Sequence, residues 1–373
     1  MSLQERIKSP GRKKILALDG GGIRGMITVE ILAAIESLLR RESGVGDAFV
    51  LADYFDFVAG TSTGAIIATC ISIGMSMDEI RRFYLDSGAE MFDKASLLDR
   101  YYRHKYEDAA LAGKLQEVLG ADTRLGDQKL RTLLMMVMRN ATTDSPWPIT
   151  NNPFAKYAQR ERTDCNLELP LWKLVRASTA APVYFPPETV RIGAKDFIFV
   201  DGGITPYNNP AFQAFLMATV DRFNVQWEAG EDQILMVSIG TGTSPDANAG
   251  LGPQDMNLLY NASRIPSALM FAALNEQDFL CRVFGRCRAG QALDREFGDL
   301  MGSHGPLQHK LFSYVRYNAE LTHEGLDALG LRDIEPAQVQ RLDSVAHIGE
   351  LQRVGRAVAE TQIEPAHFAS FSG

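Results

Sequence analysis

Short apolar runs alternate with segments of helical pattern through the first two thirds of the chain. The apolar runs have the length of buried strands, and they lie at residues 14–18, 55–59, 133–138, 197–200 and 234–239. Residues 26–40 and 65–73 carry apolar patterns typical of helices that are packed against a core. This alternation predicts an α/β fold with a largely buried, mainly parallel sheet.

The pattern changes near residue 250, where strand-like runs fade and helical patterns follow at residues 258–284 and 345–360. We therefore predict a core over residues 1–250 and a mainly helical C-terminal cap over residues 251–373, packed on the core as a candidate regulatory region. Within the core, residues 142–170 are rich in Pro, Asn and Thr, which predicts a long loop over a site.

Composition narrows the class of protein. The chain has 373 residues, is 46% hydrophobic, and has 38 Lys and Arg against 46 Asp and Glu, a formal net charge of −8. Such a balance gives no bulk attraction to a DNA or RNA polymer. The start lacks the apolar stretch of a signal peptide, and no uninterrupted apolar run is long enough to span a bilayer, so we expect a cytoplasmic protein. The four cysteines show no metal-ligand spacing and are interpreted as reduced and structural.

Two glycine motifs each follow an apolar run and precede a helical segment. The first is Asp-Gly-Gly-Gly-Ile-Arg-Gly at residues 19–25, and the second is Gly-Thr-Ser-Thr-Gly at residues 60–64. In Gly-x-Ser-x-Gly, the glycines permit a strained turn that exposes the serine hydroxyl, here that of Ser62. The N-terminus of the following helix would stabilise an oxyanion formed there.

A serine nucleophile needs a base, and two kinds of candidate are present. The usual hydrolase order places a histidine late in the chain, where His304 lies in a glycine-flanked turn. The other candidate is Asp201, which closes the apolar run at residues 197–200 and opens Asp-Gly-Gly. Partial burial would raise the pKa of such a carboxylate into a useful range.

On four motifs, taken in the same order, the chain resembles the patatin-like phospholipases. The glycine-rich oxyanion motif matches Gly20, Gly21, Gly22, Arg24 and Gly25; the nucleophile motif matches Gly60, Ser62 and Gly64; the third motif matches Asp201, Gly202 and Gly203. Residues 177–187 are similar to the stretch ahead of that family's aspartate. The resemblance covers residues 14–242 and implies a three-layer α/β/α fold with a helical C-terminal cap.

The resemblance also implies a mechanism. Ser62 would attack a fatty-acyl ester of a membrane phospholipid while Asp201 takes its proton, and Asp201 would act again as the base when water hydrolyses the acyl-enzyme. The glycine run would hold the oxyanion. This chemistry requires no metal and no cofactor. Contact with the inner face of the membrane would be peripheral, and the aromatic, basic residues 101–106 are either a contact surface or a helix flank.

A second resemblance concerns regulation. Residues 311–318 are similar to bacterial patatin-like effectors of anti-phage (CBASS) defence, which a cyclic oligonucleotide activates. The resemblance implies a cyclic dinucleotide activator and leaves room for a homo-oligomer. The nucleotide-binding candidates are residues 140–153 and the arginines Arg282, Arg286 and Arg288, since arginine suits phosphate groups. The alternative for the arginines is a solvated face paired with nearby acidic residues.

Other functions stay open on the sequence. The first glycine run after a strand satisfies half of a dinucleotide-binding fingerprint, although Glu42 follows a helical segment in place of a second strand. The Asp201 motif can also be a simple turn. The remaining alternatives are an ungated lipid esterase or thioesterase that uses a late histidine, and a nucleotide-binding protein whose hydrolase motifs are relics.

Overall fold

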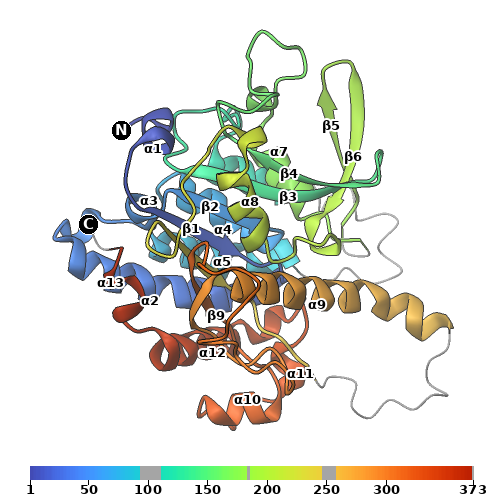
Figure 1. Cartoon of the computed structure of the whole chain (residues 1–373). Helices are drawn as coiled ribbons and strands as arrows, with labels where there is room; N and C mark the ends of the chain where they lie inside the picture. The colour runs from blue at the N-terminus through green and yellow to red at the C-terminus, as the bar shows by residue number, and fades with distance from the viewer. Residues whose placement is uncertain (93–110, 183–184, 246–257, 372–373) are drawn as a thin grey trace.

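A twisted sheet forms the centre of the molecule (Figure 1). The structure is a computed structural model that describes residues 1–92, 111–182, 185–245 and 258–371. Over these residues the strand order is β5-β6-β3-β2-β1-β7-β9-β8, with β4 paired to β3. The parallel strands are β1 (Lys13–Leu18), β2 (Phe57–Thr61), β3 (Leu133–Asn140), β7 (Ile234–Ile239), β9 (Ser313–Tyr317) and β8 (Arg286–Ala289). The antiparallel strands are β4 (Ser145–Thr150), β5 (Glu188–Ile192) and β6 (Lys195–Asp201).

Helices cover both faces of the sheet because successive side chains of a strand point to opposite sides. Leu16 and Leu18 of β1 belong to one buried cluster, while Ile15 and Ala17 belong to the other. The first cluster includes side chains of α2 (Gly25–Ser43), α3 (Leu51–Tyr54), α4 (Thr63–Ser72), α5 (Met77–Phe92), α7 (Leu171–Ser178), α10 (His323–Ala328), α11 (Pro336–Val339), α12 (Ile348–Gln362) and α13 (Ala366–Ala369). The second includes side chains of α1 (Leu3–Lys8), α8 (Ala211–Thr219) and α9 (Leu258–Phe284). The predicted α/β fold with a mainly parallel sheet is confirmed.

Short 3-10 turns connect several of these elements. They are η1 (Gly22–Arg24), η2 (Gly46–Ala48), η3 (Asn166–Glu168), η4 (Gly202–Ile204), η5 (Asp221–Phe223) and η7 (Val345–His347). Two of them belong to the predicted site, since η1 lies inside the first glycine motif and η4 directly follows Asp201.

The segment predicted as a loop over a site differs from that prediction. It contains β4, which pairs antiparallel with β3. The part after β4 lies at the edge of the sheet where β1 and β2 begin: Asn152 Nδ2 donates to the Phe223 carbonyl, and the Lys8 ammonium lies 4.7 Å from the centre of the Phe154 ring. Ser62 follows the other end of β2. The prediction failed because Pro146 and Pro148 lie within β4, an edge strand that tolerates proline, and only the Asn and Pro residues that follow it mark a turn.

The region after residue 250 is mostly helical but also completes the sheet. The long α9 has the predicted bounds, and α12 lies alongside α2 (Figure 1). Strand β9 pairs with β7, and β8 pairs with β9, although the sequence pattern predicted no strand there. The division into a core and a cap stays a prediction. Among the described helices, none combines the length and the apolar character that crossing a membrane requires.

Candidate active site

The turn between β2 and α4 presents Ser62. The backbone of this residue has φ 55° and ψ −124°, in the region that side chains rarely adopt. A Cβ on Gly60 would overlap the backbone of Gly64, so a side chain there would block the turn. The Ser62 N–H donates to Ser178 Oγ at 3.0 Å, and that hydroxyl donates to the Val137 carbonyl at 2.5 Å. These bonds hold the strained turn against β3 and α7.

Asp201 meets this serine from the end of β6. The Ser62 hydroxyl donates to Asp201 Oδ2 at 2.6 Å, and the Gly203 N–H donates to Asp201 Oδ1 at 2.6 Å. Both side chains are nearly buried, with Ser62 8% and Asp201 5% exposed. Burial raises the pKa of Asp201 to about 6, against the lowering effect of its two hydrogen bonds. At neutral pH the carboxylate is therefore ionised. Its pKa lies within about one unit of that pH, which suits a group that accepts a proton.

The first glycine motif lies beside the serine. The Gly20 N–H donates to the Asn208 carbonyl at 3.1 Å, so this amide is occupied. The N–H groups of Gly21 and Gly22 meet no acceptor among the described residues. A Cβ on Gly21 would overlap Thr241, and Gly22 has φ 60°, so both positions favour glycine. Two free backbone donors next to a serine have the composition of an oxyanion hole.

A family model supports the same interpretation: the model of the patatin-like phospholipases matches residues 16–215. The chain belongs to the patatin-like phospholipase family.

Individual relatives of this family align over part of their length. The patatin group J-1 of Solanum tuberosum is 30% identical over 62% of this chain and 61% of its own. The cGAMP-activated phospholipase of Escherichia coli (strain TW11681) is 30% identical over 62% of this chain and 62% of its own. The alignments thus span less than two thirds of these relatives. A solved structure, VipD from Legionella pneumophila, covers 92% of this chain and 67% of its own at 16% identity, with a TM-score of 0.37.

Two motif residues of this patatin-like chain fix the loop instead of facing the serine. Arg24 is buried, and its Nη1 donates to the Gln340 carbonyl at 3.2 Å, which ties η1 to the C-terminal region. Burial lowers the pKa of Arg24 to about 10, although Asp19 opposes the effect. A Cβ on Gly25 would overlap Thr63 Oγ1, so this glycine permits close packing of α2 on the start of α4.

Several supporting residues carried no signal in the sequence. The Tyr84 hydroxyl of α5 lies 2.5 Å from Thr63 Oγ1 and donates to the Thr63 carbonyl at 3.2 Å, fixing the residue after Ser62. The Arg316 guanidinium of β9 donates to both carboxylate oxygens of Asp19, at 2.9 and 2.5 Å. Only Ser178 lies in a stretch that the family resemblance marks. The others are distant in sequence and lack a motif.

The other predicted bases and binding residues lie elsewhere. None of the histidines in the described ranges hydrogen-bonds to Ser62; His304 and His309 are exposed, and the others contact Tyr317, Glu335 and Glu350. Residues 101–106 lie outside the described residues. Arg282 donates to Asp278, Gln291 and Asp299, whereas Arg286 pairs with Glu231 and Arg288 donates to Ser313. A nucleotide-binding role for these arginines stays a prediction.

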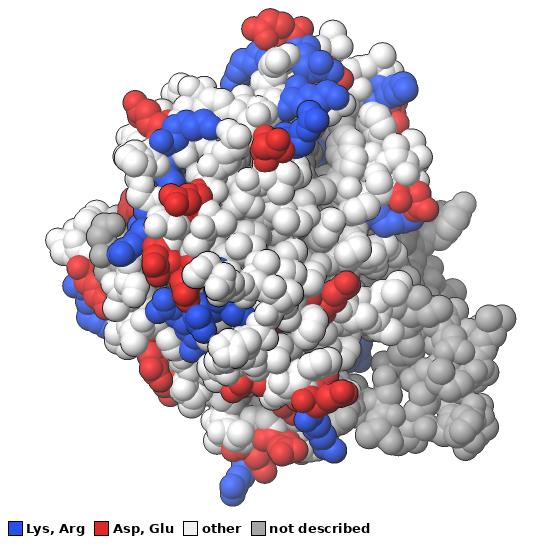
Figure 2. Space-filling view, in the orientation of Figure 1, with Lys and Arg blue, Asp and Glu red and all other residues white. Residues whose placement is uncertain are grey.

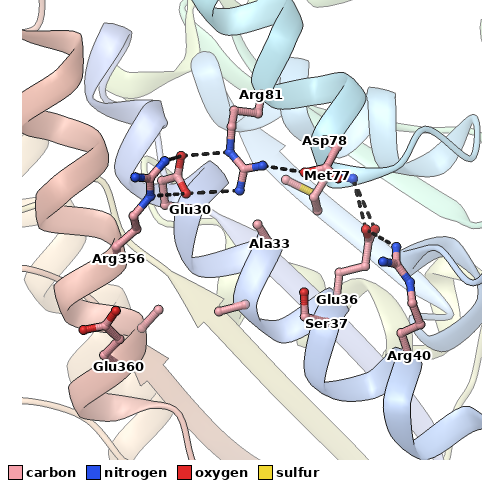
Figure 3. Close-up of a pocket in the computed structure, with 12 residues that line it drawn as sticks. Glu30, Ala33, Glu36, Ser37, Arg40, Met77, Asp78, Arg81, Arg356 and Glu360 are labelled. Atoms are coloured by element: carbon pink, nitrogen blue, oxygen red, sulfur yellow. Dashed lines mark hydrogen bonds and ion pairs between the residues drawn. The ribbon is translucent and has the colours of Figure 1, made fainter. Parts of the chain in front are cut away.

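A separate polar cavity of about 230 Å³ lies between α2, α5 and α12 (Figure 3). Its arginines are engaged by acidic neighbours: Glu30 accepts from Arg81 and Arg356, and Glu36 accepts from Arg40. The charges of this cavity thus serve mainly to join helices.

On the surface, Figure 2 shows Lys and Arg side chains interspersed with Asp and Glu over the visible face.

Proposed function

We propose that this patatin-like protein hydrolyses fatty-acyl esters of membrane phospholipids with Ser62 as nucleophile and Asp201 as base. The observation that carries the proposal is the 2.6 Å hydrogen bond from the Ser62 hydroxyl to Asp201 in a strained strand-to-helix turn. Asp201 takes the hydroxyl proton as Ser62 Oγ attacks the ester carbonyl. The proton then passes to the leaving lysophospholipid oxygen, which leaves an acyl-enzyme.

The free N–H groups of Gly21 and Gly22 would stabilise the oxyanion that forms when Ser62 attacks the ester carbonyl. Preorganised donors of this kind contribute about 3 to 4 kcal/mol each in a hydrolase for which one was removed. The positive end of α4, which begins at Thr63, adds to the same field. Each of these groups is fixed before substrate arrives, so little reorganisation accompanies the reaction.

Fatty-acid release from phospholipid vesicles tests this proposal. With a panel of cyclic dinucleotides present, we expect release by the wild-type chain and none by Ser62→Ala, while Ser43→Ala, an exposed serine of α2, behaves as wild type. Labelling by a fluorophosphonate, which forms a covalent adduct with an activated serine, gives a readout that is independent of the lipid. Equal release by Ser62→Ala and wild type would contradict the proposal.

The relative described as a cGAMP-activated phospholipase supports a second proposal, which concerns activation. We infer that a cyclic dinucleotide activates this chain in anti-phage defence, at the inner face of the membrane and with a homo-oligomer as a candidate active state. The vesicle assay is repeated with a panel of cyclic dinucleotides. Release that requires one of them supports the gate, whereas equal release without any nucleotide assigns an ungated lipid esterase.

A further inference from the structure

The side chain of Asn208 is buried beside the catalytic pair without a hydrogen-bond partner. It is 0% exposed, and neither Nδ2 nor Oδ1 meets a partner among the described residues. Leaving a buried polar group unpaired costs about 1 to 3 kcal/mol, so native proteins rarely retain one without a use. The neighbouring Asn209 shares the unpaired Nδ2 but differs at Oδ1, which accepts from the Ala211 N–H at 3.0 Å and the Ser238 hydroxyl at 3.3 Å.

The position of the Asn208 amide follows from the two glycines that it touches. Its Oδ1 would overlap a Cβ on Gly20, and the same Cβ would lie 3.2 Å from Ser62 Cβ. Asn208 Oδ1 also lies 3.2 Å from the position that a Cβ on Gly203 would occupy, and that position is 3.0 Å from Asp201 Oδ1. The amide therefore lies between the glycine loop and the turn that carries Asp201. The absence of side chains at both glycines makes room for it.

We propose that Asn208 is a positioning residue for the water that hydrolyses the acyl-enzyme, an inference that rests on the proposed function. The water donates one proton to the Asp201 carboxylate, and its second O–H donates to Asn208 Oδ1. Its oxygen attacks the acyl carbonyl. The tetrahedral intermediate then collapses, the bond to Ser62 Oγ breaks, and that oxygen regains its proton from Asp201. The products are the free fatty acid and the original dyad.

The chemistry of the amide favours water over the oxyanion as the group it serves. An oxyanion would satisfy only the Nδ2 donor and would repel the Oδ1 acceptor. A water molecule both donates and accepts, so it satisfies both atoms of the amide. The Gly21 and Gly22 amides already supply free donors for the oxyanion. Asn208 thus adds an acceptor that those backbone groups lack.

The test separates formation of the acyl-enzyme from its hydrolysis. Asn208→Leu keeps the shape of the side chain and removes both polar atoms. We expect its rate of fluorophosphonate labelling to stay within about twofold of wild type, while turnover of a p-nitrophenyl ester falls on the order of 10- to 100-fold after a burst. Intact-mass spectrometry should then detect the accumulated acyl-enzyme on Ser62.

Stability supplies a second readout. Removing an unpaired buried amide should leave the melting temperature of Asn208→Leu equal to or above that of wild type. The matched control, Asn209→Leu, removes an Oδ1 that accepts two hydrogen bonds and should melt lower without a change in the ratio of acylation to hydrolysis. If Asn208→Leu slowed labelling and turnover equally, so that the ratio of acylation to hydrolysis stayed unchanged, the assignment would be overturned. Absence of labelling in the wild type, both with and without the panel of cyclic dinucleotides, would instead overturn the proposed function.

Discussion

At the residue scale, the proposed dyad ties the activation of Ser62 to the ionisation of Asp201. The carboxylate accepts a proton only when ionised, and burial raises its pKa to about 6. We expect kcat/KM of the wild type to fall about tenfold per pH unit below that value and to level off above it. A pH profile with a soluble ester measures this. An inflection near 7 that disappears on replacing a late histidine would favour the triad instead.

The same burial predicts that Asp201 costs stability. In the folded state its pKa is about 6, above the ordinary 3.8, so the ionised form is disfavoured by folding. The cost is absent below pH 3.8, grows as pH rises to 6, and then stays near about 2 to 3 kcal/mol. Asp201→Asn, which keeps the shape, should therefore abolish turnover yet melt above wild type at pH 7 to 8.

Thermal unfolding of both proteins from pH 3.5 to 8 measures the difference. We expect the two melting temperatures to converge toward the acid end, because the wild-type carboxyl is then neutral as well. Ser62→Ala is the matched control, since it removes activity but leaves the buried charge. A lower melting temperature for Asp201→Asn at every pH would contradict the electrostatic argument.

At the element scale, the sequence predicts those helices and strands whose own residues carry the apolar pattern. β7 (Ile234–Ile239) and α9 (Leu258–Phe284) have the predicted bounds because their apolar pattern is continuous. β9 (Ser313–Tyr317) is entirely buried although it carries Ser313 and Arg316, whose partners Glu231 and Asp19 are distant in sequence. Tertiary pairing of this kind leaves no periodic signal, so the strand was missed.

The site divides along the same line. Ser62, Asp201 and the glycines were identified because the sharp turns that carry them need glycine at fixed spacing. Ser178 and Tyr84 contact the Ser62 turn from distant segments, and Asn208 lies beside it. Their residue types are common in any chain. The sequence therefore predicted two residues that the structure brings together, Ser62 and Asp201, whereas the residues that fix their turns became visible only in the fold.

One buried carboxylate joins three helices around the polar cavity. Glu30 of α2 accepts from Arg81 of α5 at 2.9 and 3.1 Å and from Arg356 of α12 at 3.2 Å (Figure 3). It also accepts from Gln352 of α12 at 2.8 Å. Burial raises the pKa of Glu30, but these bonds outweigh it and hold the pKa below its ordinary 4.5. The resulting stabilisation is present above pH 4.5 and is lost as pH falls through the lower folded value.

Glu30→Gln should therefore unfold at lower urea concentration at pH 7, with a loss of about 1 to 3 kcal/mol, because Arg356 loses its ion pair with Glu30 and Arg81 keeps only its pair with Asp78. The difference from wild type should shrink in acid. Asp333→Asn provides the control, since its pair with Arg353 is exposed and contributes little. Equal urea midpoints for Glu30→Gln and Asp333→Asn at pH 7 would contradict a clamping role.

At the scale of the whole molecule, a buried ion pair ties the C-terminal region to the glycine loop. Asp19 follows β1 and directly precedes the loop, and Arg316 lies on β9, almost 300 residues later. Both side chains are nearly inaccessible, at 1% and 3% exposed. Burial opposes the charge of Arg316, but Asp19 outweighs it and raises the pKa of the guanidinium. The region after residue 250 thus contributes to the geometry of the glycine loop.

Removing only the arginine should leave a buried, uncompensated carboxylate. We expect Arg316→Met to lose about 3 to 5 kcal/mol of unfolding free energy in urea and to slow fluorophosphonate labelling of Ser62, because the loop moves with Asp19. The double variant with Asp19→Asn removes both charges and should recover much of that stability. Arg332→Met, at an 81% exposed arginine, is the control. The penalty in Arg316→Met arises from the Asp19 charge left behind. Equal stability of Arg316→Met and the double variant would therefore show that the ion pair does not couple the two regions.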